Sequence, residues 1–491
     1  MANFRLIDIA KPLLPFFPEV ETPFERVGFD DKLIYSVFIT FIYLFAQFPL
    51  AGLEKDSQPA VNDPIYFLRG VFAAEPRTLL EFGLFPVFAS ALIMQLCAGL
   101  KLIDVNFKVK TDRELFQTCT KLFALLQYFI LANIFVMAGY YGTDLTFWQI
   151  LLVITQLTGA GMFAILLTEV IDKGLGFTSG AMLINTAVIA TNTIADTLGI
   201  AQITMDEAGN TEAQGSIINL LQSFRAKHRG FFASIFSAFT RDYLPNLTTT
   251  VILLAIAGVV CYFSSARYEV PIRSTRARSM SNIYPIRLMY CGALSVIFSY
   301  VLLFYIHVCA FVIIQIIGKN DPSGLICKIF SHYENVNNIL AVPTFPLSLL
   351  TPPRSLLKGI VRQPLTFITF TAFVVMTGIW FANQWQQISG SSAFDIAKEF
   401  KDQGVTLAGR REQNIAKELN KIIPTAAMTG AALLGLLTVA GEFLGLKGKA
   451  AGIVVGIAGA FSLLEIVTLE YQETGGSSTL ASMLNNAAGL Q

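Results

Sequence analysis

Long apolar runs, separated by short polar stretches, recur along the whole chain. Runs of about 18 or more apolar residues with few charges are typical of membrane helices, because roughly 20 residues at 1.5 Å rise cross the hydrocarbon core. Nine runs show this pattern strongly: 33–50, 82–100, 122–143, 145–168, 174–195, 243–264, 288–306, 363–382 and 422–441. A weaker tenth run, 450–469, carries Glu465 near one end. The pattern predicts an all-α membrane protein with ten transmembrane helices and both termini on the same side.

The ten predicted spans fall into two groups of five. The first group lies within residues 1–200, a connection follows at 201–242, and the second group lies within 243–470, before a tail at 471–491. A unit with an odd number of spans that is repeated in series must be inverted, which is a common plan for transport proteins. We therefore expect two inverted five-helix halves with the conducting path between them.

Two segments of the first half are apolar without being long enough to span. The first 20 residues are expected to form an interfacial helix, and the first span itself is expected to be the targeting signal. Between spans one and two, Asp63 and Pro64 are typical of a helix start. A helix over 64–74 would be only about 16 Å long. It could lie on the surface or enter a cavity as a re-entrant stopper.

Composition limits what charge can do in this chain. Of the 491 residues, 54% are hydrophobic and 14% are charged, against about 25% in soluble domains. The net charge is +1, so charges must act locally. With a cytosolic N-terminus, Lys plus Arg number 20 on the cytosolic side and 14 on the other, which favours this orientation.

Residues that carry catalytic or metal chemistry are not arranged for it in this sequence. It contains no phosphate loop and no zinc-ligand spacing, and we place His307 at a wet span end. The six cysteines have no redox or zinc spacing and are expected to be small buried apolar residues. Charged residues such as Lys121 and Glu169 fall near predicted span ends, so we find no ionisable pair inside the membrane. The sequence thus favours a passive channel without cofactor or metal over an enzyme.

Several stretches resemble one family of membrane proteins. They are TLLEFGLFP at 78–86, DRELFQ at 112–117, YEVPIRST at 268–275, DIAKEFKDQG at 395–404 and KIIPTAA at 421–427. In this order they are similar to the SecY family, the pore (alpha) subunit of the Sec protein translocon in its endoplasmic-reticulum form. The similarity is weaker at 200–240 and 316–355. In these departures the chain resembles the auxiliary second translocon of fungi rather than the principal pore subunit.

The resemblance implies a clamshell of two halves around an hourglass pore. A lateral gate would lie between spans two and three on one side and spans seven and eight on the other, with Tyr305 where an amide is expected. The plug would be residues Pro64, Ile65, Tyr66, Phe67, Leu68, Val71 and Phe72. The ring that seals the waist would be Leu84, Phe88, Ala181, Asn185, Ile297 and Val455. Ala181 is small and Asn185 is polar, so this ring departs from a purely apolar seal.

The resemblance also implies that two cytosolic loops, 265–287 and 384–421, dock on the ribosome. Their candidate ligands for ribosomal RNA are Arg273, Arg276, Arg278, Arg410 and Arg411, because arginine binds phosphate through counterion release and bidentate hydrogen bonds. Other implied partners are small beta and gamma subunits, nascent chains and signal sequences, membrane lipid and the signal recognition particle receptor. The implied location is the endoplasmic reticulum membrane, with both termini cytosolic.

Two other interpretations stay open from the sequence alone. One is a secondary transporter of small solutes with an inverted repeat, which would need an ionisable pair inside the membrane. The other is a membrane receptor that anchors ribosomes and conducts nothing, which the polar Asn185 in the ring leaves possible. Against both, the resemblance implies translocation of nascent polypeptides and insertion of their helices, with directionality supplied by synthesis on the ribosome.

Overall fold

Ten long helices form the body of the protein. The computed structural model describes residues 5–473 except for 13–14, 16, 54–62, 143–144, 205–210, 226–235, 237, 240, 242–244, 275–280, 322–323, 337–339, 353–362, 391, 408–414 and 447. The long helices are α1 (Phe29–Phe45), α3 (Phe85–Gly99), α4 (Lys110–Met137), α5 (Phe147–Val170), α6 (Gly180–Leu198), α9 (Leu247–Ser265), α10 (Leu294–Val312), α12 (Pro364–Ile388), α14 (Ile415–Gly441) and α15 (Ala450–Glu473). Each overlaps one predicted span, so the ten-helix prediction is confirmed.

Individual helices differ from the predicted spans in length. Within the described residues, seven helices are long and apolar enough to cross a membrane, namely those that begin at Lys110, Phe147, Leu247, Leu294, Pro364, Ile415 and Ala450. By contrast, α3 is apolar but has only 15 residues, and α1 has 17. Residues 78–84, expected in part to belong to the second span, form buried turns before α3 begins. The second span is therefore completed by irregular chain.

Short helices and strands occupy the two ends of the bundle. The short helices are α2 (Tyr66–Arg69), α7 (Ser216–Arg225), α11 (Leu325–Phe330) and α13 (Ala393–Gln403). The strands are β1 (Gln202–Thr204), β2 (Thr211–Ala213), β3 (Arg267–Ser274), β4 (Ser281–Arg287), β5 (Tyr333–Val336), β6 (Leu340–Pro343) and β7 (Val405–Leu407). They pair into three small antiparallel sheets, in the orders β1-β2, β4-β3-β7 and β5-β6. The expectation of helices alone missed these sheets.

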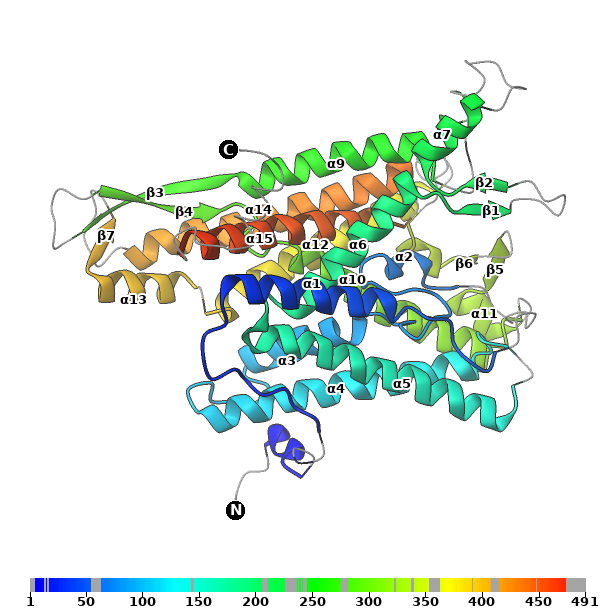
Figure 1. Ribbon diagram of the computed structural model, residues 1–491, viewed down its shortest axis with the longest axis horizontal. Coiled ribbons are helices and arrows are strands. Elements are labelled where there is room, and N and C mark those ends of the chain that lie inside the picture. Colours follow the sequence, from blue (N-terminus) through cyan, green and yellow to red (C-terminus); the bar gives the residue numbers. More distant parts are fainter. Residues whose placement is uncertain are drawn as a thin grey trace.

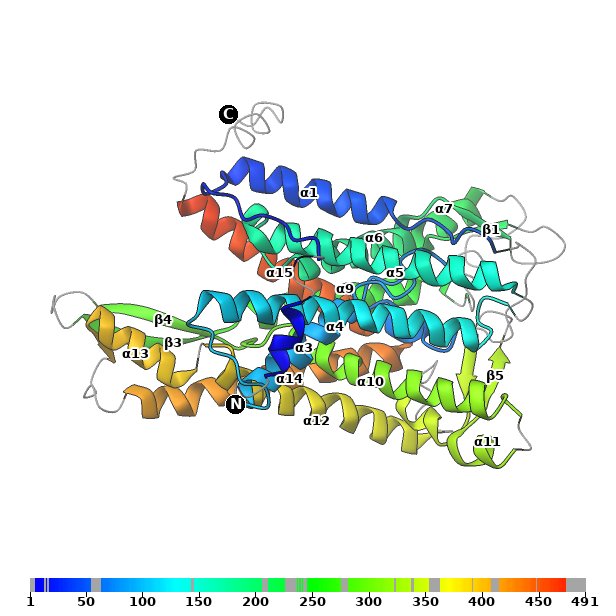
Figure 2. The same ribbon diagram turned by 90° about the horizontal axis from the view of Figure 1, so that it is seen from below.

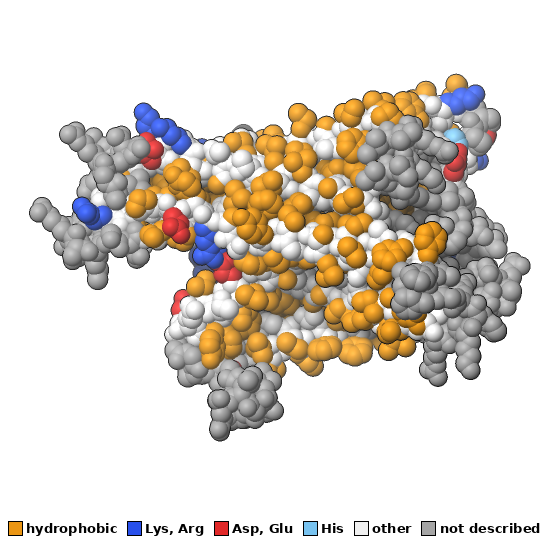
Figure 3. Space-filling view, turned by 90° about the horizontal axis from the view of Figure 1, so that it is seen from above, with side chains coloured by type: hydrophobic (Ala, Val, Ile, Leu, Met, Phe, Trp, Pro, Cys, Tyr) orange, Lys and Arg blue, Asp and Glu red, His pale blue; other side chains and the backbone are white. Residues whose placement is uncertain are grey.

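The sheets mark two opposite ends of the molecule. Figures 1 and 2 show the β4-β3-β7 sheet and α13 projecting at one end, called here the sheet end, with β1, β2, α7, β5, β6 and α11 at the other. Between these ends the surface is largely apolar, and the charged side chains lie toward both ends (Figure 3). An apolar band between two polar ends is the surface expected of a protein that spans a bilayer.

The two halves pack closely at two glycine positions of α15. A Cβ on Gly456 of α15 would overlap the side chain of Ile189 in α6, and one on Gly459 would overlap Thr186. Small residues let membrane helices approach closely, which is the main source of attraction between helices in lipid. The contact between α6 and α15 therefore closes one side of the bundle.

Two smaller expectations need correction. The interfacial helix predicted for the first 20 residues is reduced, in the described part, to a 3₁₀ turn over Leu6–Ala10. Its Ile7 is fully buried against Met94 and Phe116, and Arg5 pairs with Asp112 at 3.0 Å, so the turn packs on helices α3 and α4. The cysteines are all free, but only Cys291 and Cys327 are buried; the other four, predicted to be buried, are partly or fully exposed.

Candidate pore

The six predicted ring residues are buried and come from four helices. Leu84 and Phe88 lie at the start of α3, Ala181 and Asn185 in the first turns of α6, Ile297 in α10 and Val455 in α15. Their exposed fractions range from 0% to 7%. The five apolar members belong to one hydrophobic core. The structure therefore places all six in the interior between the halves, and their role as a sealing ring stays a prediction.

The segment predicted to be a plug helix over 64–74 is mostly irregular. Only four residues form α2, and Asp63 is not its N-cap, since the cap position is held by Ile65. The Asp63 carboxylate instead accepts a hydrogen bond from the Ile65 amide at 3.2 Å. Ala73 has a φ of 52°, which is incompatible with a continuing right-handed helix. The predicted helix was therefore too long at both ends.

The plug segment is nevertheless inside the protein. Tyr66 is half-buried, and the other six predicted plug residues are buried: Pro64, Ile65, Phe67, Leu68, Val71 and Phe72. Five of these belong to the same hydrophobic core as the apolar ring residues. The surface-helix interpretation is therefore wrong, and the segment enters the interior.

The plug backbone lies against the beginning of α15. A Cβ on Gly452 would overlap the carbonyl group of Gly70, and one on Gly448 would come within 2.8 Å of the Cβ of Phe67. Side chains at Gly452 in α15 and at Gly448 in the turn before it would occupy the space of the plug, so glycine is required for the closed arrangement. The plug thus fills a space whose wall is formed in part by the backbone at these two glycines.

An aromatic cluster joins the plug to the two sides of the predicted lateral gate. The ring of Phe72 lies 5.2 Å from that of Phe85 in α3 and 6.2 Å from that of Phe304 in α10. Phe85 and Phe304 stack directly on each other, and Tyr305 packs edge-on against Phe85 at 5.3 Å. The expected gate position of Tyr305 is therefore part of an aromatic contact. Separating α3 from α10 would expose these rings together with Phe72.

A buried ionic cluster anchors the other face of the plug. Arg69 of α2 pairs with Asp63 at 2.6 Å and with Glu81 at 2.5 Å, and it donates to the Glu81 carbonyl at 2.7 Å. The Arg69 and Glu81 side chains are 6% and 0% exposed. The Tyr140 hydroxyl lies 3.3 Å from the same guanidinium. Because Glu81 lies in the turn before α3, the Arg69–Glu81 ion pair, with the Tyr140 hydroxyl beside it, ties this face of the plug to its surroundings.

Asn185 is a buried polar side chain whose amide makes no hydrogen bond within the described part of the chain. It is fully buried, and neither its Oδ1 nor its Nδ2 has a hydrogen-bond partner among the described residues. A buried amide without partners destabilises the arrangement around it, unless water or a ligand supplies the hydrogen bonds. The position therefore favours local hydration in an otherwise apolar waist.

His307 was predicted to be a wet residue at a span end, and this is wrong. Because α10 begins at Leu294 and continues to Val312, His307 lies well inside the helix and is 0% exposed. Its Nδ1 lies 2.8 Å from the Leu303 carbonyl, and its ring packs edge-on against Phe67 of the plug at 5.0 Å. The later start of the helix moved the residue into the core, where it contacts the plug.

The sequence also missed an ionisable pair between two long helices. Lys121 of α4 lies 2.6 Å from Glu169 near the end of α5, and both side chains are largely buried. Lys173 and Glu19 complete the cluster, at 3.6 Å from Glu169 and from Lys121 respectively. The two partners come from different helices, so the pairing has no signal in the spacing along the chain. The requirement of a transporter for an ionisable pair among its helices therefore does not by itself exclude that function.

The two basic loops are joined into one element at the sheet end. Loop 265–287 forms the hairpin β3–β4, and β7 from loop 384–421 adds to β3, with Ile272 opposite Leu407 and Arg273 opposite Thr406. Val270 and Ile286 of the hairpin pack against Phe400 of α13. The alternation of apolar and exposed positions over 269–273, with Val270 and Ile272 apolar, was the signal for this strand.

Only one of the five predicted ribosome-contacting arginines can be placed. Arg273 is exposed on β3. Arg276, Arg278, Arg410 and Arg411 lie outside the described residues. The register pairs residue 274 of β3 with 405 of β7, so the described parts of the two loops belong to one sheet.

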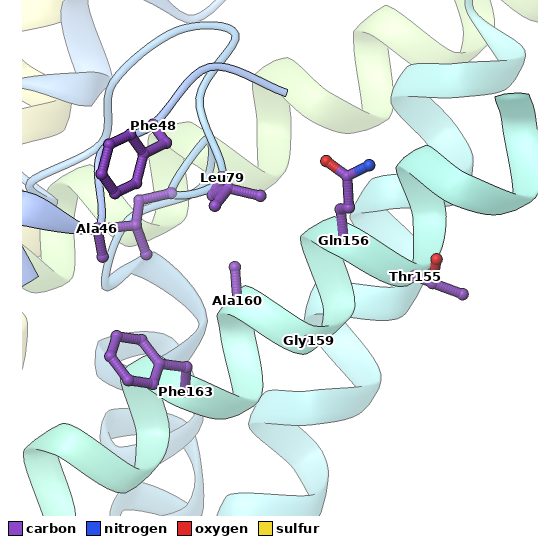
Figure 4. A pocket seen from close by; sticks show the side chains of 9 residues that line it. Ala46, Phe48, Leu79, Thr155, Gln156, Gly159, Ala160 and Phe163 are labelled. Carbon is purple, nitrogen blue, oxygen red and sulfur yellow. The ribbon is translucent and has the colours of Figure 1, made fainter. Parts of the chain in front are cut away.

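A groove opens on the apolar surface between α5 and the chain after α1. It has a volume of about 370 Å³ and is shown in Figure 4. Its lining residues are Ala46, Phe48, Leu79, Leu80, Thr155, Gln156, Gly159, Ala160 and Phe163. Gln156 uses its amide to bond both backbone groups of Ala51, so it is satisfied within the protein. A Cβ on Gly159 would meet nothing within 4 Å, so the groove is unoccupied above this residue.

Comparisons with known proteins extend over nearly the whole chain. The SecY family model matches residues 78–472, and the model for the plug domain of Sec61p matches residues 41–76. The Sec sixty-one protein homolog of Saccharomyces cerevisiae is 66% identical over 484 residues, which are 99% of each chain. The protein transport protein SEC61 subunit alpha of Neurospora crassa is 33% identical over 480 residues, which are 96% of this chain and 98% of the relative.

Solved structures show the same architecture. A chain in the structure of the idle yeast Ssh1 complex bound to the yeast 80S ribosome has a TM-score of 0.79 and 66% identity, and the match covers 98% of both chains. A chain in a structure described as a protein conducting channel has a TM-score of 0.75 at 24% identity, covering 94% of this chain and 96% of that one. The second likeness shows the fold alone.

Proposed function

Because this chain belongs to the SecY family, in the branch of the fungal second translocon, we propose that it is the pore subunit of a protein-conducting channel in the endoplasmic reticulum membrane. It translocates nascent polypeptides and inserts their apolar helices into lipid, and it is not an enzyme. The observation that carries this proposal is the buried plug segment, which fills the interior between the two halves beside the predicted ring. A solute transporter has no need of a removable polypeptide stopper.

The sheet end is proposed to face the cytosol and the ribosome, with both termini on that side. Both the positive-inside count and the basic loops 265–287 and 384–421 support this orientation. The solved yeast relative, which shares 66% of its residues with this chain, was captured on a ribosome. Ribosomal RNA presents a dense array of phosphates, and exposed arginines on a projecting sheet suit it. Signal sequences and the signal recognition particle receptor are further proposed partners.

Charge reversal in the two loops tests this docking. We expect Arg273→Glu combined with Arg411→Glu to weaken ribosome binding and to lower its salt slope by about one unit for each lost phosphate contact. Folding should be nearly unchanged, since exposed charges contribute little to stability. The measurement is ribosome affinity of the detergent-solubilised protein at several salt concentrations. Lys110→Glu, at an exposed site on α4 outside the sheet, is the matched control. Wild-type affinity and slope in the double variant would contradict ribosome docking through these loops.

A small subunit with one membrane helix is proposed to pack in the groove of Figure 4. Thr155, Gly159 and Phe163 are exposed at four-residue intervals on α5, so they share one helix face. Small residues on such a face allow another helix to approach closely. The groove thus supports the beta or gamma partner implied by the family, and lipid would fill it when that partner is absent.

The polar ring position sets the energy needed to open the channel. We expect Asn185→Ile to stabilise the closed state, because it removes an amide that has no partner in the dry interior. Insertion of weakly hydrophobic signal sequences should then fall more than insertion of strong ones. The measurement is signal-dependent translocation into reconstituted vesicles, with Asn133→Ile, at a more exposed site on α4, as the control. Equal losses for both classes of signal would contradict a ring position.

A further inference from the structure

Both ends of the β3–β4 hairpin meet one carboxylate. Arg267 begins β3 and Arg287 ends β4, and the two residues are directly opposite in the antiparallel register. Glu465 of α15 lies 3.0 Å from the Arg267 guanidinium and 2.8 Å from the Arg287 guanidinium, using a different oxygen for each. Like charges directly opposite across two strands repel each other, and the shared carboxylate offsets that repulsion. The base of the hairpin is thereby attached to α15.

These two contacts lie where the sheet leaves the body of the protein. Glu465 lies eight residues before the end of α15, and its two ion pairs place this part of the helix at the base of β3 and β4. The Glu465 side chain is 15% exposed, whereas those of Arg267 and Arg287 are 42% and 46% exposed. Ion pairs with such half-exposed partners contribute little to folding stability. Their more specific effect is geometric, because a carboxylate that bonds both strands fixes the direction of the hairpin.

The same end of α15 is also tied to the first half of the protein. Glu470 pairs with Lys32 of α1, and Glu473 lies 3.4 Å from Arg26 in the chain that precedes α1. Three acidic residues of one helix end therefore contact the sheet, α1 and the N-terminal strap. This part of α15 therefore links the sheet to both halves, in addition to the apolar cluster that the sheet shares with α13 and α14.

We propose that Glu465 is a positioning residue that holds the β4-β3-β7 sheet in the orientation in which it docks on the ribosome. This proposal rests on the proposed function and goes beyond it, because it assigns a role to a residue of α15, outside the two loops predicted to contact the ribosome. It also divides the arginines of the hairpin into two groups. Arg267 and Arg287 are bound to Glu465 and position the sheet, while Arg273 is exposed farther along β3 and remains available for phosphate.

The test compares Glu465→Gln with Glu473→Gln in the full chain. Both changes remove one negative charge from the same helix end, but Glu473 pairs with Arg26 and not with the hairpin. Spin labels at positions 283 and 126, both exposed, report the distance between the sheet and α4 in the absence of ribosomes. We expect Glu465→Gln to broaden this distance distribution and Glu473→Gln to leave it unchanged. The exchange Glu465→Arg with Arg287→Glu should narrow it again.

Ribosome binding supplies a second readout. A sheet without a fixed direction must be ordered on docking, so we expect Glu465→Gln to weaken affinity by about two- to tenfold with an unchanged salt slope. An affinity that rises together with a steeper slope would mean that Glu465 only screens the two arginines, and it would overturn the proposal. An unchanged distance distribution would overturn it as well. If the wild-type protein bound no ribosomes, the proposed function would fail, while the distance measurement would still judge the role of Glu465.

Discussion

We expect Gly452→Ala to make the resting channel leak ions. The added methyl group on α15 would overlap the carbonyl of Gly70, so it disfavours the closed position of the plug while removing no existing contact. Overpacking of this kind costs about 1–3 kcal/mol. If the whole cost falls on the closed state, the ratio of open to closed channels rises by about 5- to 150-fold. The measurement is single-channel or ensemble conductance of the reconstituted protein without ribosomes.

The same substitution elsewhere separates this effect from a general loss of packing. Gly258 lies in α9, and a Cβ there would meet nothing within 4 Å. Gly258→Ala should therefore leave the conductance unchanged. A resting conductance of Gly452→Ala equal to that of the wild type would mean that the plug yields without leaving its site, or that it does not close the path.

We expect Arg69→Met to release the plug and to destabilise the closed protein. The substitution leaves the fully buried Glu81 and the neighbouring Asp63 without their cation, and breaking a buried ion pair costs about 3–5 kcal/mol. We expect a large resting leak and a lower thermal unfolding temperature in detergent. Adding Glu81→Gln should recover part of the stability, because it removes one of the uncompensated charges. It should not restore the seal, since the anchor stays broken.

The matched control for this prediction is Arg26→Met. Arg26 also pairs with a glutamate, but its side chain is 78% exposed, so its loss should change the unfolding temperature little. A tight, fully stable Arg69→Met channel would contradict the anchoring role of the buried cluster.

The buried cluster also changes what a plug deletion measures. From the sequence, removal of 64–74 should leave the fold intact and raise the resting leak, because no span is lost. In the structure, the deletion also removes Arg69 and leaves Glu81 buried without its partner. We therefore expect a clean deletion only together with Glu81→Gln. Equal leak conductance in this combined variant and in the wild type would refute the plug assignment.

The helices were predictable because each long apolar run can be read locally. The conformation of the plug segment was not predictable, since it is set by contacts with distant residues. Nothing in residues 64–74 alone shows that Gly70 abuts Gly452 or that Arg69 needs Glu81. Positive φ at Ala73 reflects the same tertiary control over local propensity. For His307, an error of six residues in the start of α10, at Leu294 instead of 288, was enough to reverse its predicted environment.

The sheet shows a second limit of reasoning from the sequence. The two basic loops were singled out for their arginines, but their pairing into one sheet could not be seen in the sequence, because β7 joins β3 across a long separation in the chain. The alternation of Val270, Ile272 and their exposed neighbours favoured a strand and could have been used. The ionic links of Lys121, Arg69 and Glu465 all join segments whose proximity only the folded chain reveals.

The pairing of β7 with the hairpin makes the two basic loops a single lever. With β3 as the shared central strand, tilting one loop must tilt the other by the same angle. A particle that docks on this lever restrains one rigid body instead of two independent tethers, so the entropy of alignment is lost once. Lengthening or shortening a strand in either loop would misalign both loops. We therefore expect length changes in the two loops to be tolerated only when they occur together.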